Sequence, residues 1–298
     1  MKDIAQRLAT AIVGDVRTDE PLSRYTSFKI GGPADLFVEP QTTHDLNVAL
    51  TCLRQQNVPV FILGNGTNLL VSDSGYRGAV IRLAGDFARL DFHGNQVDVG
   101  AAVSLPKLAK DACGRGLSGL EFAAGIPATV GGALVMNAGA HGSEIGNLVT
   151  EAEILDANGK VRTFTRSELS LSYRRSVLPP QAVVCRVKLA LQPGETEVLL
   201  AKCQEHMLFR RKRQPRLPNA GSIFKNPPQD AAGRLIEAVG LKGRRAGGAM
   251  ISDVHANFFV NCGNATAEDV CTLIKMAQVA VAKQFGIELK LEVRLLGY

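Results

Sequence analysis

Residues Gly125–Gly142 read GIPATVGGALVMNAGAHG, with five glycines, four alanines and one proline. The stretch holds no acidic residue and no lysine. Residues this small let the backbone approach a large flat ligand, or let peptide N–H groups point into one concavity that suits an anion. Tight packing of a glycine-rich turn inside a core explains the same composition. The stretch therefore predicts either close backbone packing or a ligand site lined by backbone.

A second loop, rich in glycine and asparagine, lies upstream and reads GNGTNLLV at 64–71. It directly follows a short apolar strand expected at 59–63, and a helix capped by Thr42 precedes that strand. Strand, helix, strand and glycine loop is the layout of an α/β lobe that offers its loop to a ligand. Two separate backbone-rich loops indicate a bound dinucleotide.

The chain carries no standard nucleotide-binding fingerprint. Gly64-Asn-Gly66 follows a strand, but Leu69 stands where the fingerprint needs its third glycine. Gly114-Arg-Gly116-Leu-Ser-Gly119 matches the spacing G-x-G-x-x-G, but it follows an expected helix, whereas the fingerprint needs a strand before it. It is better interpreted as a helix C-cap with a turn. No phosphate-binding lysine follows any glycine loop. The sequence therefore does not support a Rossmann lobe.

Length and composition describe an ordered globular chain. The 298 residues can bury a substantial core and divide into two or three lobes. No apolar run approaches the roughly 18 residues that a membrane span needs, and residues 2–12 predict an amphipathic helix rather than a signal peptide. The six cysteines show neither a disulfide framework nor metal-site spacing, which indicates a reducing cytoplasm and no metal site.

The net charge of +6 is concentrated at Arg210–Arg213 and Arg216, the basic end of an amphipathic helix expected at 196–213. Three interpretations stay open. The cations match the helix dipole and solvent, they hold phosphates of a small ligand, or they bind nucleic acid. The last ranks third because tryptophan is absent and tyrosine is scarce.

Several further elements are expected from local patterns. Hairpins are predicted around His93-Gly94-Asn95 and, with a type I′ turn, around Asn158-Gly159. A long helix is predicted at 266–285, and an alternating strand at 287–295 has Glu292 on its polar face. The proline-rich segment 214–228 cannot be a regular element and marks a lobe boundary or an active loop.

The two glycine loops together resemble the FAD-cradling loops of the p-cresol methylhydroxylase-type flavoproteins. Four more segments follow in order, YTSFKIGGPA at 25–34, YRRS at 173–176, NAGSIFKNP at 219–227, and GGA at 247–249 with HAN at 255–257. With them the chain, from about Leu22 to Arg294, is similar to the shorter class of the UDP-N-acetylenolpyruvoylglucosamine reductases. The resemblance implies an α+β fold. A two-lobed FAD-binding domain (1–85 and 86–204) precedes a C-terminal α/β substrate-binding domain (205–298).

The resemblance also implies the reaction. NADPH reduces a noncovalently bound FAD, and UDP-N-acetylglucosamine enolpyruvate then accepts a hydride and a proton to become UDP-N-acetylmuramate for peptidoglycan. It implies a cytoplasmic monomer that neither binds nucleic acid nor inserts into a membrane. The residues matched to FAD binding are Gly64, Asn65, Gly66, Thr67, Asn68, Leu69, Gly125, Ile126, Pro127, Thr129, Val130, Gly131, Gly132, Asn137, Ala138 and Gly139.

Three residues match the family's catalytic positions. The resemblance implies that Arg174 stabilises the enolate-like intermediate, although Arg175 competes for that role. It also implies that Ser222 donates the proton and that Glu292 holds the intermediate or positions the proton. From the local sequence alone, Arg174 would be interpreted as an exposed charge at a strand end, Ser222 as a turn serine and Glu292 as a surface carboxylate.

The residues matched to substrate binding are Tyr173, Arg213, Lys225, Asn226 and His255. The longer class of the family carries an inserted tyrosine that covers the sugar nucleotide. This chain has no tyrosine between Tyr173 and Tyr298, so the basic run at 210–216 is the candidate for the diphosphate.

Two other functions fit parts of the sequence. A flavin oxidase of the same superfamily, acting on an alcohol or a lactone, would share the fold. A basic protein that binds nucleic acid or polyphosphate would share the charge, but that function leaves the glycine loops unexplained.

Overall fold

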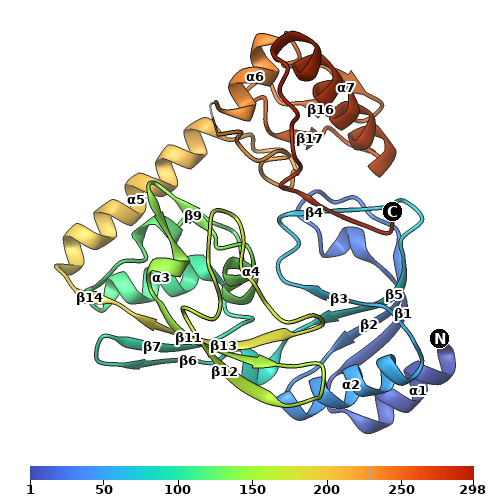
Figure 1. Ribbon diagram of the computed structural model, residues 1–298, viewed down its shortest axis with the longest axis vertical. Coiled ribbons are helices and arrows are strands. Elements are labelled where there is room, and N and C mark those ends of the chain that lie inside the picture. The colour runs from blue at the N-terminus through green and yellow to red at the C-terminus, as the bar shows by residue number, and fades with distance from the viewer. Residues whose placement is uncertain (229) are drawn as a thin grey trace. The chain divides into compact units, whose positions relative to one another are not determined.

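The computed structural model describes residues 1–228 and 230–298, which form two compact units (Figure 1). The first unit comprises Met1–Thr18, Leu36–Asn65 and Gly78–Arg210. The second comprises Asp19–Asp35, Gly66–Arg77 and Arg211–Tyr298. The chain therefore passes between the units several times, and the lobe boundaries expected at 85 and 204 stay a prediction.

The first part of unit 1 is a sheet covered by two helices, α1 (Lys2–Ala11) and α2 (Thr43–Gln55) (Figure 1). The strand order is β1-β2-β5-β3, with β3 parallel to β5. These strands are β1 (Asp15–Pro21), β2 (Pro33–Glu39), β3 (Val60–Leu63) and β5 (Tyr76–Arg82). Thr42 caps α2 as predicted, since its hydroxyl accepts from Asp45 N–H at 3.1 Å and the Asp45 carboxylate accepts in return from Thr42 N–H.

The second part of unit 1 is a five-stranded antiparallel sheet in the order β12-β11-β13-β7-β6. Its strands are β6 (Leu90–His93), β7 (Gln96–Gly100), β11 (Val149–Leu155), β12 (Val161–Thr165) and β13 (Val183–Ala190). The remaining elements are α3 (Leu105–Gly114), α4 (Val130–Val135), α5 (Thr196–Arg213), β8 (Leu117–Ser118), β9 (Gly139–Ala140), β10 (Ser143–Glu144) and β14 (Gln192–Pro193). One apolar cluster joins α3, α4 and this sheet.

Both predicted hairpins are present, but the turn at Asn158-Gly159 is not type I′. That turn needs a positive φ at both central residues, and only Gly159 has one, at 77°. The Asp156 carboxylate instead accepts from the N–H groups of Asn158 (2.8 Å) and Lys160 (3.0 Å). The aspartate side chain therefore replaces the tighter turn with a longer loop.

The predicted helix at 196–213 is present as α5, but its predicted apolar face is not. Leu199 and Cys203 are its only buried residues in the described chain, and Met207, Leu208 and Phe209 are more than 40% exposed. No helix of the described residues is both long and apolar enough to cross a membrane.

Unit 2 is built on α6 (Ala232–Ala238) and α7 (Ala267–Phe285), which pack on a small antiparallel sheet in the order β15-β16-β17. Its strands are β15 (Arg245–Ala246), β16 (Ala249–Ile251), β17 (Phe259–Asn261), β4 (Leu69–Val71) and β18 (Arg294–Leu296). β18 pairs in parallel with β4, so the end of the chain lies beside the glycine loop that leads into β4.

The prediction of one regular strand at 287–295 is wrong. Its alternation is real, since Leu289 and Val293 are buried while Glu288 and Lys290 are exposed. The segment changes partner along its length, however. Leu291 makes an isolated bridge with Phe224, and only the last residues form β18.

Asp73 fixes the start of α7 by accepting hydrogen bonds from Ala267 N–H (2.8 Å) and Glu268 N–H (3.2 Å). Replacing Asp73 with alanine removes both acceptors from the first turn, so we expect the free energy of unfolding to fall by about 1–2 kcal/mol. Urea unfolding measures this change. Asp253→Ala, at an exposed aspartate of the same unit, is the matched control and should change nothing; equal losses in both variants would contradict the capping role.

Candidate functional site

Gly64 and Asn65, the residues of the first glycine loop that belong to unit 1, contact the second glycine stretch. Asn65 Nδ2 donates to the carbonyl of Pro127 at 3.2 Å. A Cβ atom placed on Gly64 would lie only 2.8 Å from Thr129 Oγ1, so the two backbones approach closely because residue 64 is a glycine. The prediction that these loops lie together is confirmed. Their contact with FAD stays a prediction.

Packing explains part of the glycine content of the stretch 125–142. A Cβ on Gly131 would meet the Cβ of Ala101 at 2.9 Å, and a Cβ on Gly139 would meet the carbonyl of Ser143 at 2.6 Å. Gly132 differs, because a Cβ added there would have only Thr129 Oγ1, at 3.2 Å, within 4 Å of it. Close packing therefore requires Gly131 and Gly139, whereas a Cβ at Gly132 would crowd only the side chain of Thr129.

The peptide donors suited to a phosphate lie in the upstream loop. The N–H groups of Val130 and Gly131, at the start of α4, already donate to the carbonyls of Val103 and Ala101, each at 2.9 Å. Within the described residues, the N–H groups of Asn65, Gly66 and Asn68 have no hydrogen-bond acceptor. Such N–H groups in a loop with a left-handed glycine form a concavity that suits an anion. The loop at 64–69 therefore fits the diphosphate of a dinucleotide.

Arg174 is held against the glycine-rich stretch in a strained conformation. It lies in a tight turn closed by Ser172 and Arg175, with φ at +54°, and its guanidinium donates to the carbonyl of Gly139 at 3.1 Å. The fully buried Asn137 anchors the turn through a hydrogen bond from Nδ2 to the carbonyl of Ser172 (3.0 Å). Left-handed φ values at non-glycine residues carry strain and cluster at functional sites.

Arg210 brings a second guanidinium to the same stretch. Its side chain packs over Gly125, where an added Cβ would lie 2.5 Å from Arg210 Cδ. Burial lowers the pKa of Arg210, and the nearby charge of Arg174 lowers it further. One turn earlier on α5, His206 stacks on His141 with ring centroids 3.8 Å apart. Burial and the neighbouring cations lower the pKa of His141, so this surface of unit 1 favours an anion.

In unit 2, backbone pairing fixes the segment that carries Ser222. Ile223 N–H donates to the carbonyl of Asn257 at 2.8 Å, and the carbonyl of Ile223 accepts from Glu292 N–H at 2.8 Å. The two segments with the predicted proton donor and the predicted glutamate are therefore neighbours. Asn68 of the first glycine loop joins them, because its Nδ2 donates to the carbonyl of Glu292 at 3.1 Å.

Asn257, which is 3% exposed, locks this arrangement through its side chain. Its Oδ1 accepts from Phe224 N–H at 3.0 Å, and its Nδ2 donates to the carbonyl of Phe224 at 2.8 Å. The amide thus pairs with the backbone as a neighbouring strand would. Sequence reasoning took His255 from the segment HAN and missed Asn257, although a single amide before the apolar run FFV at 258–260 was the available signal.

The predicted substrate residues are less closely grouped. Asn226 Oδ1 accepts from Ala232 N–H at 3.0 Å and so caps α6, while His255 Nδ1 accepts from Asn257 N–H at 3.2 Å and burial lowers its pKa. The backbone N–H of Lys225 donates to the carbonyl of Lys290. Lys225 itself is half-buried. Tyr173 and Arg213 are exposed. Substrate binding by all five stays a prediction.

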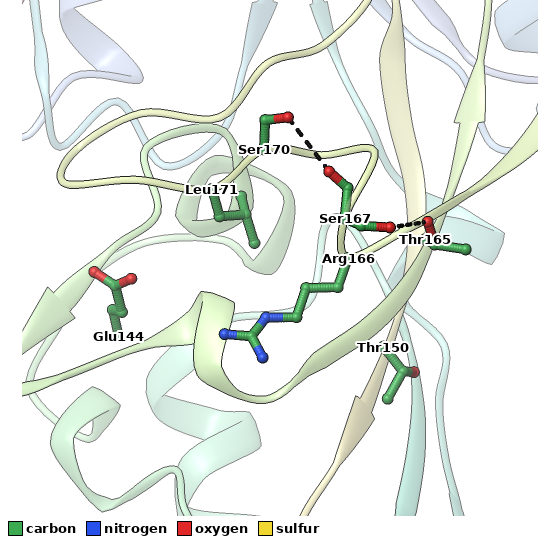
Figure 2. A pocket seen from close by; sticks show the side chains of 7 residues that line it. All are labelled: Glu144, Thr150, Thr165, Arg166, Ser167, Ser170 and Leu171. Carbon is green, nitrogen blue, oxygen red and sulfur yellow. Dashed lines mark hydrogen bonds between the residues drawn. The ribbon is translucent and has the colours of Figure 1, made fainter.

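A shallow hollow of about 590 Å³ lies elsewhere on unit 1 (Figure 2). Its lining residues are Glu144, Thr150, Thr165, Arg166, Ser167, Ser170 and Leu171. Ser170 Oγ donates to the carbonyl of Ser167, and the hydroxyls of Thr165 and Ser167 are 3.0 Å apart. None of the predicted site residues lines this hollow, so it is not part of the candidate site.

Comparison with known proteins defines the class first. Residues 34–165 match the FAD binding domain model. A solved structure titled wild-type Phl p 4.0202, a glucose dehydrogenase, shares the fold over 65% of this chain and 44% of its own, with a TM-score of 0.50 and 14% identity. The chain thus contains an FAD-binding domain and has the expected α+β architecture.

The remaining comparisons define the family. Residues 214–296 match the C-terminal domain of UDP-N-acetylenolpyruvoylglucosamine reductase. UDP-N-acetylenolpyruvoylglucosamine reductase 2 of Symbiobacterium thermophilum is 48% identical over 302 residues, which cover 100% of this chain and 98% of the relative. The crystal structure of the Thermus caldophilus reductase is 40% identical, with a TM-score of 0.83 over 95% of this chain and 98% of its own. The chain belongs to the UDP-N-acetylenolpyruvoylglucosamine reductase family.

We expect Asn257→Asp to destabilise the protein and to displace the Ser222 segment. The substitution keeps the acceptor for Phe224 N–H but places a buried carboxylate against the carbonyl of Phe224. Losing the hydrogen bond to the buried carbonyl of Phe224 should lower the free energy of unfolding by about 1–3 kcal/mol. Urea unfolding and single-turnover kinetics measure the two effects. Asn264→Asp, at an exposed site of the same unit, should change neither; unaltered stability of Asn257→Asp would contradict the locking role.

Proposed function

We propose that the chain reduces UDP-N-acetylglucosamine enolpyruvate to UDP-N-acetylmuramate with electrons from NADPH, a step of peptidoglycan synthesis. The family assignment supports this activity over the oxidase and over the nucleic-acid binder. The observation that carries the proposal is the backbone hydrogen bond from Glu292 N–H to the carbonyl of Ile223, together with the bond from the Asn68 side chain to the carbonyl of Glu292. It joins the proposed proton donor, the proposed glutamate and a cofactor loop within one unit.

FAD, when bound without a covalent link, supplies the hydride chemistry, and the loops at 64–69 and 125–139 are the residues proposed to hold it. Their fit rests on the peptide donors of the first loop, described above, and on Gly132, which is only half-buried in the second. Hydride addition to the methylene carbon of the substrate moves negative charge onto its carboxylate. Arg174 then stabilises that charge through its planar guanidinium. The contact with Gly139 favours Arg174 over Arg175 for this role.

Ser222 donates the proton to the carbon next to the carboxylate, and Glu292 holds the intermediate or positions the proton. A serine hydroxyl is a weak acid, so it serves only where the receiving carbon is strongly basic. Hydrogen bonds at Ile223 and Phe224 fix the backbone beside Ser222, so the Cα–Cβ bond that carries the hydroxyl is held in one direction.

The diphosphate of the substrate is proposed to bind the basic run at 210–216. Support comes from Arg210, because burial and the nearby charge of Arg174 lower its pKa, and an anion bound beside the two guanidinium groups would offset their repulsion. We further propose a cytoplasmic monomer. The six free cysteines agree with a reducing compartment.

The visible spectrum of the purified protein tests the proposal. We expect flavin absorbance that NADPH bleaches without oxygen and that UDP-N-acetylglucosamine enolpyruvate then restores. A protein that neither contains FAD nor takes it up would refute the proposal. A flavin that oxygen reoxidises rapidly and that the enolpyruvyl sugar leaves reduced would point to the oxidase instead.

A further inference from the structure

Two buried cysteines meet between helices α3 and α5 of unit 1, and neither has a role in the proposed reaction. Cys113 Sγ and Cys203 Sγ lie 3.2 Å apart, although 90 residues separate them along the chain. Cys113 is fully buried and Cys203 is 5% exposed. We propose that Cys113 and Cys203 form a reversible thiol–disulfide site that a peroxide closes and a dithiol reductant reopens.

The two thiols differ in their access to solvent, which assigns their order of reaction. Cys203 is 5% exposed, whereas Cys113 is fully buried. A peroxide that diffuses in from solvent therefore meets Cys203 first. The thiolate is the nucleophile in thiol oxidation, and the hydrogen bond between the two sulfurs places Cys113 to react next.

The chemistry balances with hydrogen peroxide as the oxidant. The Cys203 thiolate attacks one peroxide oxygen, the O–O bond breaks, and the departing hydroxide takes a proton to become water. The resulting sulfenic acid condenses with a neighbouring thiol. The sulfur of Cys113 attacks the sulfur of Cys203, an S–S bond forms, the S–O bond breaks, and a second water leaves. Two thiols lose two electrons, and the peroxide gains them.

The packing of α5 allows the two sulfurs to close to bonding distance. They must approach from 3.2 Å to about 2.05 Å. Leu199 and Cys203 are the only buried residues of α5 in the described chain, so few side chains resist this shift. The same helix carries His206 and Arg210 against the stretch 125–142. A disulfide therefore ties α3 to a helix that contacts a proposed cofactor loop.

Thiol counting and peptide mapping of the flavin-loaded protein test the proposal. Hydrogen peroxide, followed by alkylation with N-ethylmaleimide under denaturing conditions, is expected to reduce the free thiols from six to four. Mass spectrometry should recover one linked peptide pair that contains Cys113 and Cys203, and dithiothreitol should restore all six thiols. Because the linked loop is long, the oxidised protein should also melt at a higher temperature.

Three variants sharpen this test. Cys113→Ser should form no linked pair and should accumulate a sulfenic acid at Cys203 that dimedone labels. Cys203→Ser should form neither product. Cys52→Ser, at a half-buried cysteine of the same unit, should still form the linked pair. Six free thiols after peroxide treatment, or oxidation of Cys113 and Cys203 to partners other than each other, would overturn the proposal.

Discussion

Replacing Ser222 with alanine is expected to leave flavin reduction by NADPH nearly unchanged and to slow turnover by about 10²- to 10⁴-fold, the usual contribution of a general acid. The proton is needed only when the enolpyruvyl sugar accepts the hydride, so the first half-reaction does not use the hydroxyl. The fold should survive, because the backbone bonds at Ile223 and Phe224 hold the segment. Stopped-flow absorbance measures the two half-reactions separately.

Two controls separate proton donation from a structural effect of Ser222→Ala. Ser170→Ala removes a serine hydroxyl from the hollow of Figure 2, where no site residue lies, and should alter neither half-reaction. The melting temperature of Ser222→Ala should match that of the unaltered protein. Equal losses in both half-reactions of Ser222→Ala would refute its role as the proton donor.

Local sequence signals predicted the elements whose stability is local. Thr42 and Thr266 begin helices with capping boxes, because each hydroxyl and the aspartate three residues later exchange hydrogen bonds within one turn. The hairpin at 93–95 likewise needs only a short turn between two paired strands. These patterns are complete within a few residues, so they can be recognised without knowing the rest of the fold.

The strand prediction that failed depends on partners far along the chain. The segment 287–295 alternates as a strand should, but Leu291 pairs with Phe224 while β18 pairs with β4. No local pattern specifies such a change of partner. The type I′ turn predicted at 158–159 failed for a local reason instead, because the Asp156 carboxylate accepts from the N–H groups of Asn158 and Lys160.

The candidate site was predictable only in part for the same reason. The resemblance named Ser222 and Glu292, but it could not supply Asn257, whose role depends on a strand-like pairing with Phe224. The glycine loops fitted two interpretations, close backbone packing and a ligand site. Composition indicated close backbone approach, and only the structure separates Gly131, which is buried against Ala101, from Gly132, which is half-buried and lies near Thr129.

Gly66→Ala is expected to cost about 3 kcal/mol or more of folding free energy and to abolish FAD retention. Gly66 has φ at +61°, and an added Cβ would lie 2.1 Å from the carbonyl oxygen of Tyr25. The carbonyl of Gly66 also accepts from Ser27 N–H at 3.1 Å, so the loop cannot move away freely. Urea unfolding of the FAD-free protein measures the packing cost, and the flavin content after gel filtration measures retention.

Gly94→Ala isolates the steric part of this cost. Gly94 has nearly the same φ, +62°, but nothing lies within 4 Å of its added Cβ. Backbone strain alone should therefore cost Gly94→Ala about 1 kcal/mol and leave FAD bound. The difference between the two variants measures the overlap with Tyr25, since the φ values of Gly66 and Gly94 match. Equal losses of stability in both variants would show that the close approach to Tyr25 adds no packing cost. Retention of flavin by Gly66→Ala would show that this approach does not shape the first glycine loop for its ligand.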